Sequence, residues 1–300
     1  MPALMKGHTF KKHGHKMTYP CVAELKYDEI RCHVKVHLEV GFGIKRTVQF
    51  LSYAGKPLAN MEQFAPKFAE LSRLTGWLEF DCGFEVNGNF NDSYRWVRST
   101  KGLPDDLVNA STRFVLFDLP EHIGTYSMRE HARDECVRVW CDYVGYGVVF
   151  DVPASRTCLN PEEVHEYFNE ATEWGFEGLM VKSLDHVYER GARIYGWLKY
   201  KPEEDADGVI TELHEAICGK DQPHLGLRKG DRLGRIGSVT VRMADGSTAS
   251  PHGIAFPLGR DMFDHPEKYI GQWCEFKYME IDRQGGYRHP TFHRLREAKE

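Results

Sequence analysis

The stretch AELKYDEIRC, residues 23–32, places a lysine among acidic residues in a segment that otherwise has the composition of a strand. Glu24, Lys26 and Asp28 fall on one side of it at the period of two that is typical of strands. Charged side chains of strands ordinarily face water, so a solvated sheet face is the simplest interpretation. The alternative is that Lys26 is a nucleophile and that the surrounding charges bind a nucleotide.

Composition limits the class of protein. With 300 residues, of which 41% are hydrophobic, the chain can bury a large core in one large or two modest domains. No stretch approaches the roughly 18 apolar residues of a membrane span, and the N-terminus lacks the apolar segment of a signal peptide. We therefore expect a cytoplasmic protein without a membrane partner. The net charge of −5 means that any nucleic-acid surface is a local patch.

Cysteines and histidines give no metal pattern. The eight cysteines contain no C-x-x-C pair, and several stand in apolar runs, which favours reduced, buried thiols. His8, His13 and His15 lie in a segment that we expect to be a flexible, solvated N-terminal tail.

The chain alternates between strand and helix patterns, which predicts an α+β fold. Residues 20–53 alternate as an antiparallel hairpin, with Cys32, Val34, Val36 and Leu38 on one face. Helices are predicted over residues 60–74, 126–144 and 160–175, the last with Asn160 as its N-cap. Strands are predicted within 76–86, 112–120, 176–185 and 196–202. Residues 202–208, PEEDADG, are a hinge candidate, and the short strands and glycine turns beyond them predict a small antiparallel barrel.

Five short stretches carry residues suited to nucleotide chemistry. They are ELKYDEIR (24–31), LEFD (78–81), FVLFD (114–118), EGLMVK (177–182) and WLKYK (197–201). Together they supply lysines that can neutralise phosphates, carboxylates that can hold Mg²⁺, and an aromatic ring that can stack on a base. Brought into one site, they would support phosphoryl transfer from a nucleotide.

In this order the stretches resemble the motifs of ATP-dependent DNA ligases, in particular the small two-domain bacteriophage type within the covalent nucleotidyltransferase superfamily. The family's nucleophile motif, K-x-D-G-x-R, stands here as KYDEIR, with Glu29 in place of the glycine. EGLMVK and WLKYK match later motifs, and GGYRHPTFHRLREAKE (285–300) resembles the C-terminal motif with Ala298 in place of an aspartate. Five ordered matches are far more specific than one, so they favour the nucleophile interpretation of Lys26.

The resemblance implies a fold and a function. The fold would be an N-terminal nucleotidyltransferase (adenylation) domain of antiparallel sheets with flanking helices, residues 1–201, and a C-terminal OB-fold β-barrel, residues 202–300. The function would be that of a monomeric DNA ligase that uses ATP and Mg²⁺ to seal nicks in double-stranded DNA during repair and replication. It would act through a lysyl-AMP and then a 5′-adenylated DNA intermediate.

The resemblance also implies roles for individual residues. Lys26 would attack the α-phosphate of ATP, with Lys199 and Lys201 sharing the developing charge. Nearby Arg31, Lys199 and Lys201 would favour the neutral form of Lys26, whose ordinary pKa is about 10.4. Contacts with the nucleotide or its metal ion would come from further residues: Glu24 at the adenine edge, Phe117 stacked on the ring, Arg31 and Asp81 at the ribose, Glu177 and Asp81 at the metal, Lys182 and Arg193 in the pocket, and Arg294, Arg296 and Lys299 at the pyrophosphate.

Two assignments stay open at this point. The family's L-D-G-E motif can be placed on LEFD, with Asp81 in the role of the glutamate, but Glu79 and Glu85 share the same strand face by period and are also eligible. The family's arginine in an S-R-S-G-K-like stretch is Tyr53 here, so Arg98 is a candidate for its phosphate contact.

Three other functions are weighed against the DNA ligase. An mRNA-capping guanylyltransferase shares the nucleophile chemistry but uses GTP, and an RNA ligase fits less well because the C-terminal pattern is that of DNA ligases. A non-enzymatic DNA-binding module would use Lys26 only as part of a basic patch. An NAD-dependent ligase is not expected, because the 25 residues before Lys26 leave little room for a domain that binds nicotinamide mononucleotide.

Overall fold

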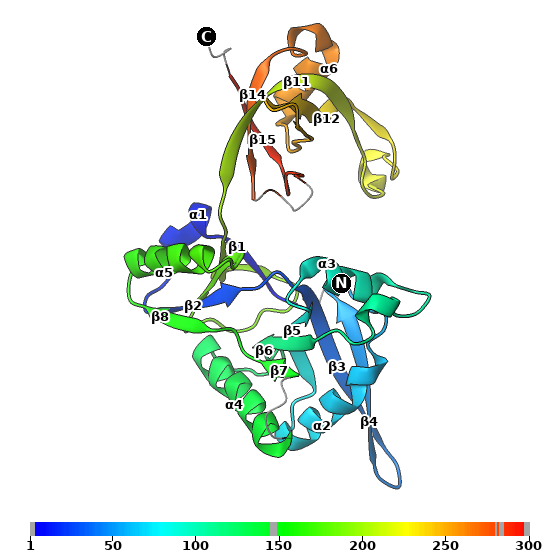
Figure 1. Cartoon of the computed structure of the whole chain (residues 1–300), viewed down its shortest axis with the longest axis vertical. Coiled ribbons are helices and arrows are strands. Elements are labelled where there is room, and N and C mark those ends of the chain that lie inside the picture. Colours follow the sequence, from blue (N-terminus) through cyan, green and yellow to red (C-terminus); the bar gives the residue numbers. More distant parts are fainter. Residues whose placement is uncertain (1–3, 145–148, 280, 282–284, 297–300) are drawn as a thin grey trace. The chain divides into compact units, whose positions relative to one another are not determined.

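The chain divides into two compact units, Met1–Tyr200 and Lys201–Glu300 (Figure 1). The structure is a computed structural model that describes residues 4–144, 149–279, 281 and 285–296. In these residues the first unit holds two five-stranded sheets and the second unit holds another. All three sheets are largely antiparallel, with helices packed against them, so the predicted α+β class is confirmed.

One sheet of the first unit has the strand order β4-β3-β5-β6-β7. Its strands are β3 (Ile30–Val40), β4 (Ile44–Ser52), β5 (Glu79–Val86), β6 (Thr112–Asp118) and β7 (Phe150–Asp151). The predicted hairpin is β3 and β4, in register at Val36 and Val48. Cys32, Val34 and Val36 are buried as their alternation predicts, whereas Leu38 is 43% exposed where the hairpin extends into solvent.

Helices cover the apolar face of this sheet. They are α2 (Ala65–Thr75), α3 (Phe90–Arg98) and α4 (Tyr126–Val144). Phe68 of α2 is fully buried and its ring meets those of Phe80, Phe114 and Phe150. The helix pattern of residues 60–74 thus corresponds to α2 preceded by a short 3₁₀ turn, η2 (Glu62–Phe64), while α3 was not predicted.

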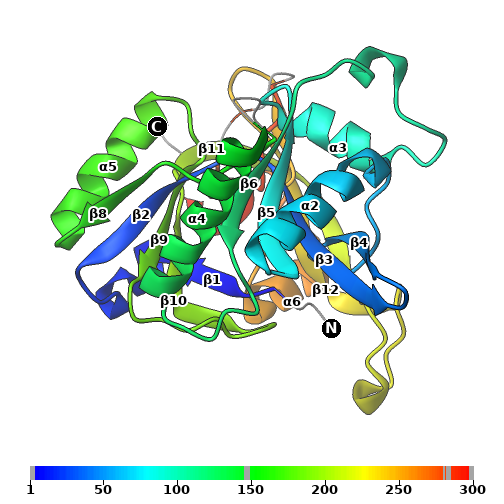
Figure 2. The ribbon, with the colours of Figure 1, turned by 90° about the horizontal axis from the view of Figure 1, so that it is seen from below.

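The other sheet of the first unit has the order β1-β10-β9-β2-β8. Its strands are β1 (Lys6–Thr9), β2 (Cys21–Lys26), β8 (Ser155–Cys158), β9 (Gly178–Ser183) and β10 (Arg193–Tyr200). Helix α5 (Pro161–Glu173) packs on it through Val164 and Tyr167. The Asn160 side chain accepts a hydrogen bond from the Glu163 amide at 2.9 Å, which confirms the predicted N-cap. Figure 2 shows this sheet beside the one that contains β3, β5 and β6.

The N-terminal segment is part of the fold, so the expectation of a flexible, solvated tail is wrong. Strand β1 pairs with β10 in parallel, and α1 (Phe10–His13) with the 3₁₀ turn η1 (Gly14–Lys16) follows it. Leu4 and Met5 are fully buried and Phe10 is 5% exposed. The apolar side chains between the lysines and histidines hold the segment in place, because their burial outweighs the local polarity of the sequence.

The second unit is built on a sheet with the order β13-β12-β11-β14-β15. Its strands are β11 (Glu204–Ile217), β12 (Arg232–Arg242), β13 (Thr248–Ala249), β14 (Trp273–Tyr278) and β15 (Thr291–Arg296). Helix α6 (Phe256–Asp264) packs against β12, the 3₁₀ turn η5 (Pro266–Lys268) follows α6, and the 3₁₀ turn η4 (Pro223–Leu225) lies between β11 and β12. The antiparallel pairing is as predicted, but β11 with 14 residues and β12 with 11 residues are longer than the short strands expected. The predicted closed barrel is not formed among the described strands, in which β13 and β15 are the two edges.

The hinge candidate at residues 202–208 is shorter than predicted. Strand β11 begins at Glu204 and pairs with β14 from that residue to Val209, so its acidic residues lie in a sheet. Between β10 and β11 only Lys201, Pro202 and Glu203 lie outside strands. Pairing with β14 makes residues 204–208 a strand, and no local pattern in this acidic stretch indicates that strand.

The cysteines are free thiols, as predicted, and all but Cys141 are buried. Across the described parts of the chain, none of the helices has the length and apolar character needed to cross a membrane.

Candidate functional site: a pocket between two sheets

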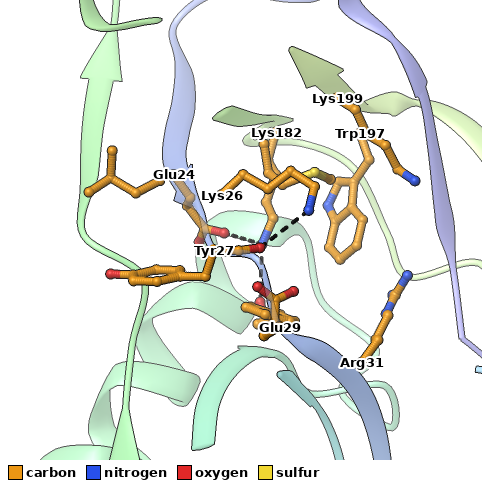
Figure 3. A pocket seen from close by; sticks show the side chains of 11 residues that line it. Glu24, Lys26, Tyr27, Glu29, Arg31, Lys182, Trp197 and Lys199 are labelled. Atoms are coloured by element: carbon orange, nitrogen blue, oxygen red, sulfur yellow. Dashed lines mark hydrogen bonds and ion pairs between the residues drawn. The ribbon is translucent and has the colours of Figure 1, made fainter. Parts of the chain in front are cut away.

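A pocket of about 210 Å³ lies where the two sheets of the first unit face each other. The sheet of β2, β9 and β10 contributes one wall, β3 and β6 contribute the other, and the segment between β2 and β3 joins them (Figure 3). The lining residues are Glu24, Leu25, Lys26, Tyr27, Glu29, Arg31, Phe117, Met180, Lys182, Trp197 and Lys199. Residues from four of the five stretches singled out in the sequence thus come together.

Lys26 stands at the end of β2, where the strand leaves the sheet. Its side chain is 16% exposed, and its Nζ forms an ion pair with Glu177 and donates to the Tyr27 carbonyl at 3.4 Å. The Glu177 amide in turn donates to the Lys26 carbonyl at 3.1 Å, so the backbone fixes the two residues side by side.

The charges nearest to Lys26 are negative. Burial favours its neutral form, but the Glu29 and Glu177 carboxylates outweigh this effect and raise the pKa of Lys26. The expectation that nearby cations would favour the neutral amine is therefore wrong for the ligand-free pocket. The physical reason is that Arg31 is itself paired with a carboxylate, while Glu29 faces the lysine.

Glu24 and Lys182 form a buried ion pair at 2.6 Å on the floor of the pocket. Glu24 also accepts hydrogen bonds from Tyr126 and Arg133, and Lys182 donates to the Phe117 carbonyl at 3.1 Å. Although burial alone would raise it, Lys182 and Arg133 lower the pKa of Glu24, and burial lowers the pKa of Lys182. The buried Glu24 and Lys182 side chains thus hold each other in place through their opposite charges.

Sequence reasoning missed the α4 side of this network. Tyr126, Arg129 and Arg133 are buried on one face of α4, and Arg129 Nε binds Asp118 at 2.7 Å. Their spacing of three and four residues was visible in the sequence, since it puts a tyrosine and two arginines on one helix face. The usual expectation that arginines face water concealed the signal.

Arg31 forms a two-pronged ion pair with Asp81, through Nε to Oδ1 at 2.9 Å and Nη2 to Oδ2 at 2.6 Å. Tyr188 also donates to Asp81, at 2.9 Å. The other two eligible acids are engaged elsewhere: Glu79 pairs with His33 and Arg190, and Glu85 pairs with Arg113.

Of the three acids, Asp81 is thus the one that binds a residue lining the pocket, namely Arg31. It is fully buried and does not line the pocket itself. Its oxygens accept hydrogen bonds from Arg31 and Tyr188, and its assignment as a metal ligand stays a prediction. Glu177 is another carboxylate that could bind a metal ion together with phosphate oxygens. No group of three or more metal-ligating side chains is found among the described residues.

Glu29 occupies the position of the motif's glycine and lies inside the pocket. Its Oε2 is buried and makes no hydrogen bond within the described part of the chain. Burial raises the pKa of its carboxyl to about 7, against the opposing effect of Lys26. The side chain fits over Gly83 of β5, where an added Cβ would come within 2.2 Å of Glu29 Cγ. Nothing in the sequence pattern indicated that a glycine 54 positions further along would make room for it.

Other predicted residues are not among those that line the pocket. Arg193 is exposed and donates to the Gly7 carbonyl at 2.9 Å, so it does not line the pocket. Lys201 follows the end of β10 and falls in the second unit. Arg98 is exposed on α3, with its guanidinium over the Tyr94 ring, and offers no contact to the pocket.

The C-terminal arginines are held by carboxylates of the second unit. Arg294 binds Glu275 at 2.8 Å, and Arg296 binds Asp207 and Glu275, each at 2.8 Å. Lys299 and Ala298 lie outside the described residues.

Comparison with known proteins assigns a class. Residues 94–201 match the family model "ATP dependent DNA ligase domain". That segment carries Glu177 and five of the eleven residues that line the pocket, among them Phe117, Lys182 and Lys199. This part of the chain is similar to an ATP-dependent DNA ligase domain, and the resemblance drawn from the motifs is confirmed.

Particular relatives fit that class. The chain is 30% identical over 137 residues to the DNA ligase of Enterobacteria phage T3 and 31% identical over 144 residues to that of Escherichia phage T7. These matches cover 45% and 43% of this chain but only 37% and 40% of the phage enzymes. The matched region is therefore well under two thirds of the relatives' own length.

Solved structures share the fold over nearly the whole chain. A chain named Pmar-Lig_Pre superposes with a TM-score of 0.77 at 20% identity, covering 99% of this chain and 68% of that one. A structure from work on DNA binding with a minimal scaffold by Lig E DNA ligases gives 0.67 at 18% identity, covering 99% and 100%. At these identities the likeness concerns the fold.

Proposed function

We propose that this protein is an ATP-dependent DNA ligase that seals nicks in duplex DNA through a lysyl-AMP intermediate. One observation carries the proposal: Lys26 projects into a pocket whose walls hold residues from four ordered motif stretches, including Glu24, Phe117, Lys182 and Lys199. The match of residues 94–201 to the ligase domain family supports it independently.

Different pocket residues would bind different parts of ATP. The Glu24–Lys182 pair would present an acceptor and a donor to the edge of the adenine, while the Phe117 ring stacks on its face. Lys26 Nζ would attack the α-phosphate, forming a P–N bond as the P–O bond to pyrophosphate breaks. Lys199 would stabilise the negative charge that develops on the phosphate oxygens.

The Lys26–Glu177 ion pair must open before the attack, because an ammonium group has no lone pair. A Mg²⁺ ion held by Glu177 and the phosphates would supply Lewis-acid stabilisation of the phosphate charge. With Glu177 bound to the metal ion, the Lys26 ammonium group would lose its ion-pair partner and release one proton to solvent, which leaves the amine lone pair for the attack. We infer that the binding of ATP and the metal ion brings Lys26 to its reactive form.

The later steps transfer AMP to the 5′-phosphate at the nick, and the neighbouring 3′-hydroxyl displaces it to close the backbone. We propose that the second unit is an OB-fold that binds the DNA, which its five-stranded antiparallel sheet supports. The pyrophosphate role of Arg294, Arg296 and Lys299, the monomeric state and the cytoplasmic location stay predictions.

Covalent labelling tests the proposal. Wild-type protein is incubated with α-labelled ATP, GTP or NAD and Mg²⁺, separated by denaturing electrophoresis, and then given nicked duplexes with DNA or RNA strands. We expect labelling by ATP alone and sealing of the DNA nick. Lys26→Ala and Lys26→Arg should both lose the label, since a guanidinium stays protonated. Lys45→Ala, which removes a lysine that is 73% exposed, is the matched control.

Each other function has its own outcome. Labelling by GTP would indicate a capping guanylyltransferase, and sealing confined to RNA would indicate an RNA ligase. The absence of any label on the wild-type protein would leave only a DNA-binding module. A label that survives in Lys26→Ala would refute the nucleophile assignment.

A further inference from the structure

Glu29 is a pocket residue for which the proposed chemistry has no use. Its side chain enters from the segment between β2 and β3 and points into the space that Lys26 and Arg31 also face (Figure 3). Its Oε2 is buried without a hydrogen-bond partner in the described residues. Leaving a buried carboxylate oxygen unpaired costs free energy, so such a group is usually completed by a ligand or has a functional role.

The neighbours of Glu29 define which part of a nucleotide would meet it. A Cβ added to Gly83 would lie 2.2 Å from Glu29 Cγ and 2.7 Å from Phe117 Cζ, so the Glu29 chain and the Phe117 ring are neighbours. On its other side, Glu29 is the carboxylate with the strongest electrostatic effect on Lys26. Glu29 therefore stands between the ring on which the base would stack and the nitrogen that would attack the α-phosphate.

In any nucleotide the sugar lies between the base and the α-phosphate. The sugar carries hydroxyl groups, which can donate a hydrogen bond to a carboxylate, whereas a phosphate oxygen would repel it. The adenine has one exocyclic amine, and Glu24 on the pocket floor is placed to receive it. A ribose hydroxyl is thus the group of the nucleotide that can donate a hydrogen bond to Glu29.

Asp81, the acid expected at the ribose, is not free to fill this role. It is fully buried behind Arg31, which takes both of its oxygens, and Tyr188 adds a third donor. The Glu29 carboxylate packs over Gly83 and reaches the pocket, so it can bind the ribose in place of the Asp81 carboxylate. The glutamate at position 29 and the glycine at position 83 fit together sterically, since a side chain at 83 would exclude Glu29.

We propose that Glu29 is a specificity-determining residue that accepts a hydrogen bond from a ribose hydroxyl of ATP and so selects ribonucleotides over deoxynucleotides. This inference rests on the proposed function, because it takes ATP as the occupant of the pocket. It assigns to this chain a sugar contact made from within the nucleophile motif itself, two residues before Arg31.

Equilibrium binding tests the inference without chemistry. Isothermal titration calorimetry in the absence of Mg²⁺ gives the affinity of ATP, 2′-deoxy-ATP and 3′-deoxy-ATP for wild type, Glu29→Ala and Glu29→Gln. The exposed Glu39→Ala on β3 is the matched control for loss of a carboxylate. Ratios between nucleotides cancel the general electrostatic gain from removing a negative charge, since that gain acts on every triphosphate alike.

For wild type and the Glu39→Ala control, we expect ATP to bind about tenfold or more tightly than the deoxynucleotide that lacks the contacted hydroxyl. In Glu29→Ala that ratio should fall to within about threefold of unity, because the hydroxyl has lost its acceptor. Glu29→Gln should keep part of the ratio, since its amide oxygen still accepts at the same reach. The specificity ratios for Lys26 adenylation should follow the same order.

Three results would overturn the inference. All three leave the ratio unchanged in Glu29→Ala: unaltered affinities, an equal rise for the three nucleotides, which would make Glu29 only an obstruction, and an equal loss, which would make it only structural. Failure of the proposed function looks different, because wild-type protein would then neither bind ATP nor become labelled by it.

Discussion

Replacing Glu29 by glutamine should stabilise the ligand-free protein at alkaline pH. The substitution keeps the size of the side chain and removes its charge. Glu29 faces Lys26 and Arg31, which favour its charged form, and Glu177 and Asp28, which oppose it, but burial is the largest influence. The folded protein therefore holds a proton on Glu29 at a pH where the unfolded chain has released it.

The magnitude follows from the pKa. The carboxyl shifts from its ordinary pKa of 4.5 to about 7 on folding. Each pKa unit corresponds to about 1.4 kcal/mol, so ionising this group should lower the free energy of unfolding by about 3 kcal/mol. The sign is that of an acid with a raised pKa: the cost is absent well below pH 4.5, grows as the pH rises towards 7, and is complete near pH 8.

Urea unfolding of wild type and Glu29→Gln at pH 5 and pH 8 measures this cost. We expect the variant to gain about 2.5 kcal/mol of stability relative to wild type between the two pH values, since part of the cost is already present at pH 5. Each protein gives a change in the free energy of unfolding from pH 5 to pH 8. Subtracting the wild-type change from that of the variant isolates Glu29, because all other titrating groups are common to both proteins. A variant that is less stable than wild type at both pH values, with no pH-dependent gain, would refute the assignment of a costly buried charge to this site.

The remaining predictions concern packing, capping and DNA binding. Phe68→Ala should cost about 3–5 kcal/mol in a thermal or urea transition, because its fully buried ring joins α2 to the rings of β5, β6 and β7. Asn160→Ala should cost about 1 kcal/mol through the lost cap of α5, and Asn160→Ser should restore most of it. Affinity for a nicked duplex should fall steeply between low and moderate salt, since a chain of net charge −5 binds phosphates with a few local cations; affinity that does not change with salt would contradict this. In paired single-turnover assays, Arg296→Ala should slow adenylation of Lys26 more than sealing of a pre-adenylated nick, whereas equal losses would point to its ion pairs with Asp207 and Glu275 as a purely structural role.

Several features could be read from the sequence because they depend on neighbouring residues. The alternation of β3, the Asn160 cap and the buried cysteines follow from strand period, local hydrogen bonding and side-chain polarity. Lys26, Phe117, Lys182 and Lys199 were found because ordered motifs mark them without any knowledge of the fold.

The errors arose where a long-range partner overrode the local pattern. The N-terminal residues look solvated in sequence, yet Leu4 and Met5 are fully buried, and Met5 packs against Ile194 and Trp197 of β10. Arg193 fits a motif spacing, but its place on β10 turns it towards the Gly7 carbonyl. In both cases the deciding contact joins residues more than 180 positions apart in the chain.

The sequence by itself determined the α+β class, the strand and helix periods and the set of residues able to handle a nucleotide, because each depends on short-range order along the chain. Only the tertiary structure decided which charges meet. It pairs Arg31 with Asp81 and places the Glu177 and Glu29 carboxylates near Lys26. It also brings Gly83 next to position 29, which leaves room for the Glu29 side chain in the pocket. Electrostatic interactions depend on distance through space and on burial, and neither is fixed until strands far apart in the chain have packed together.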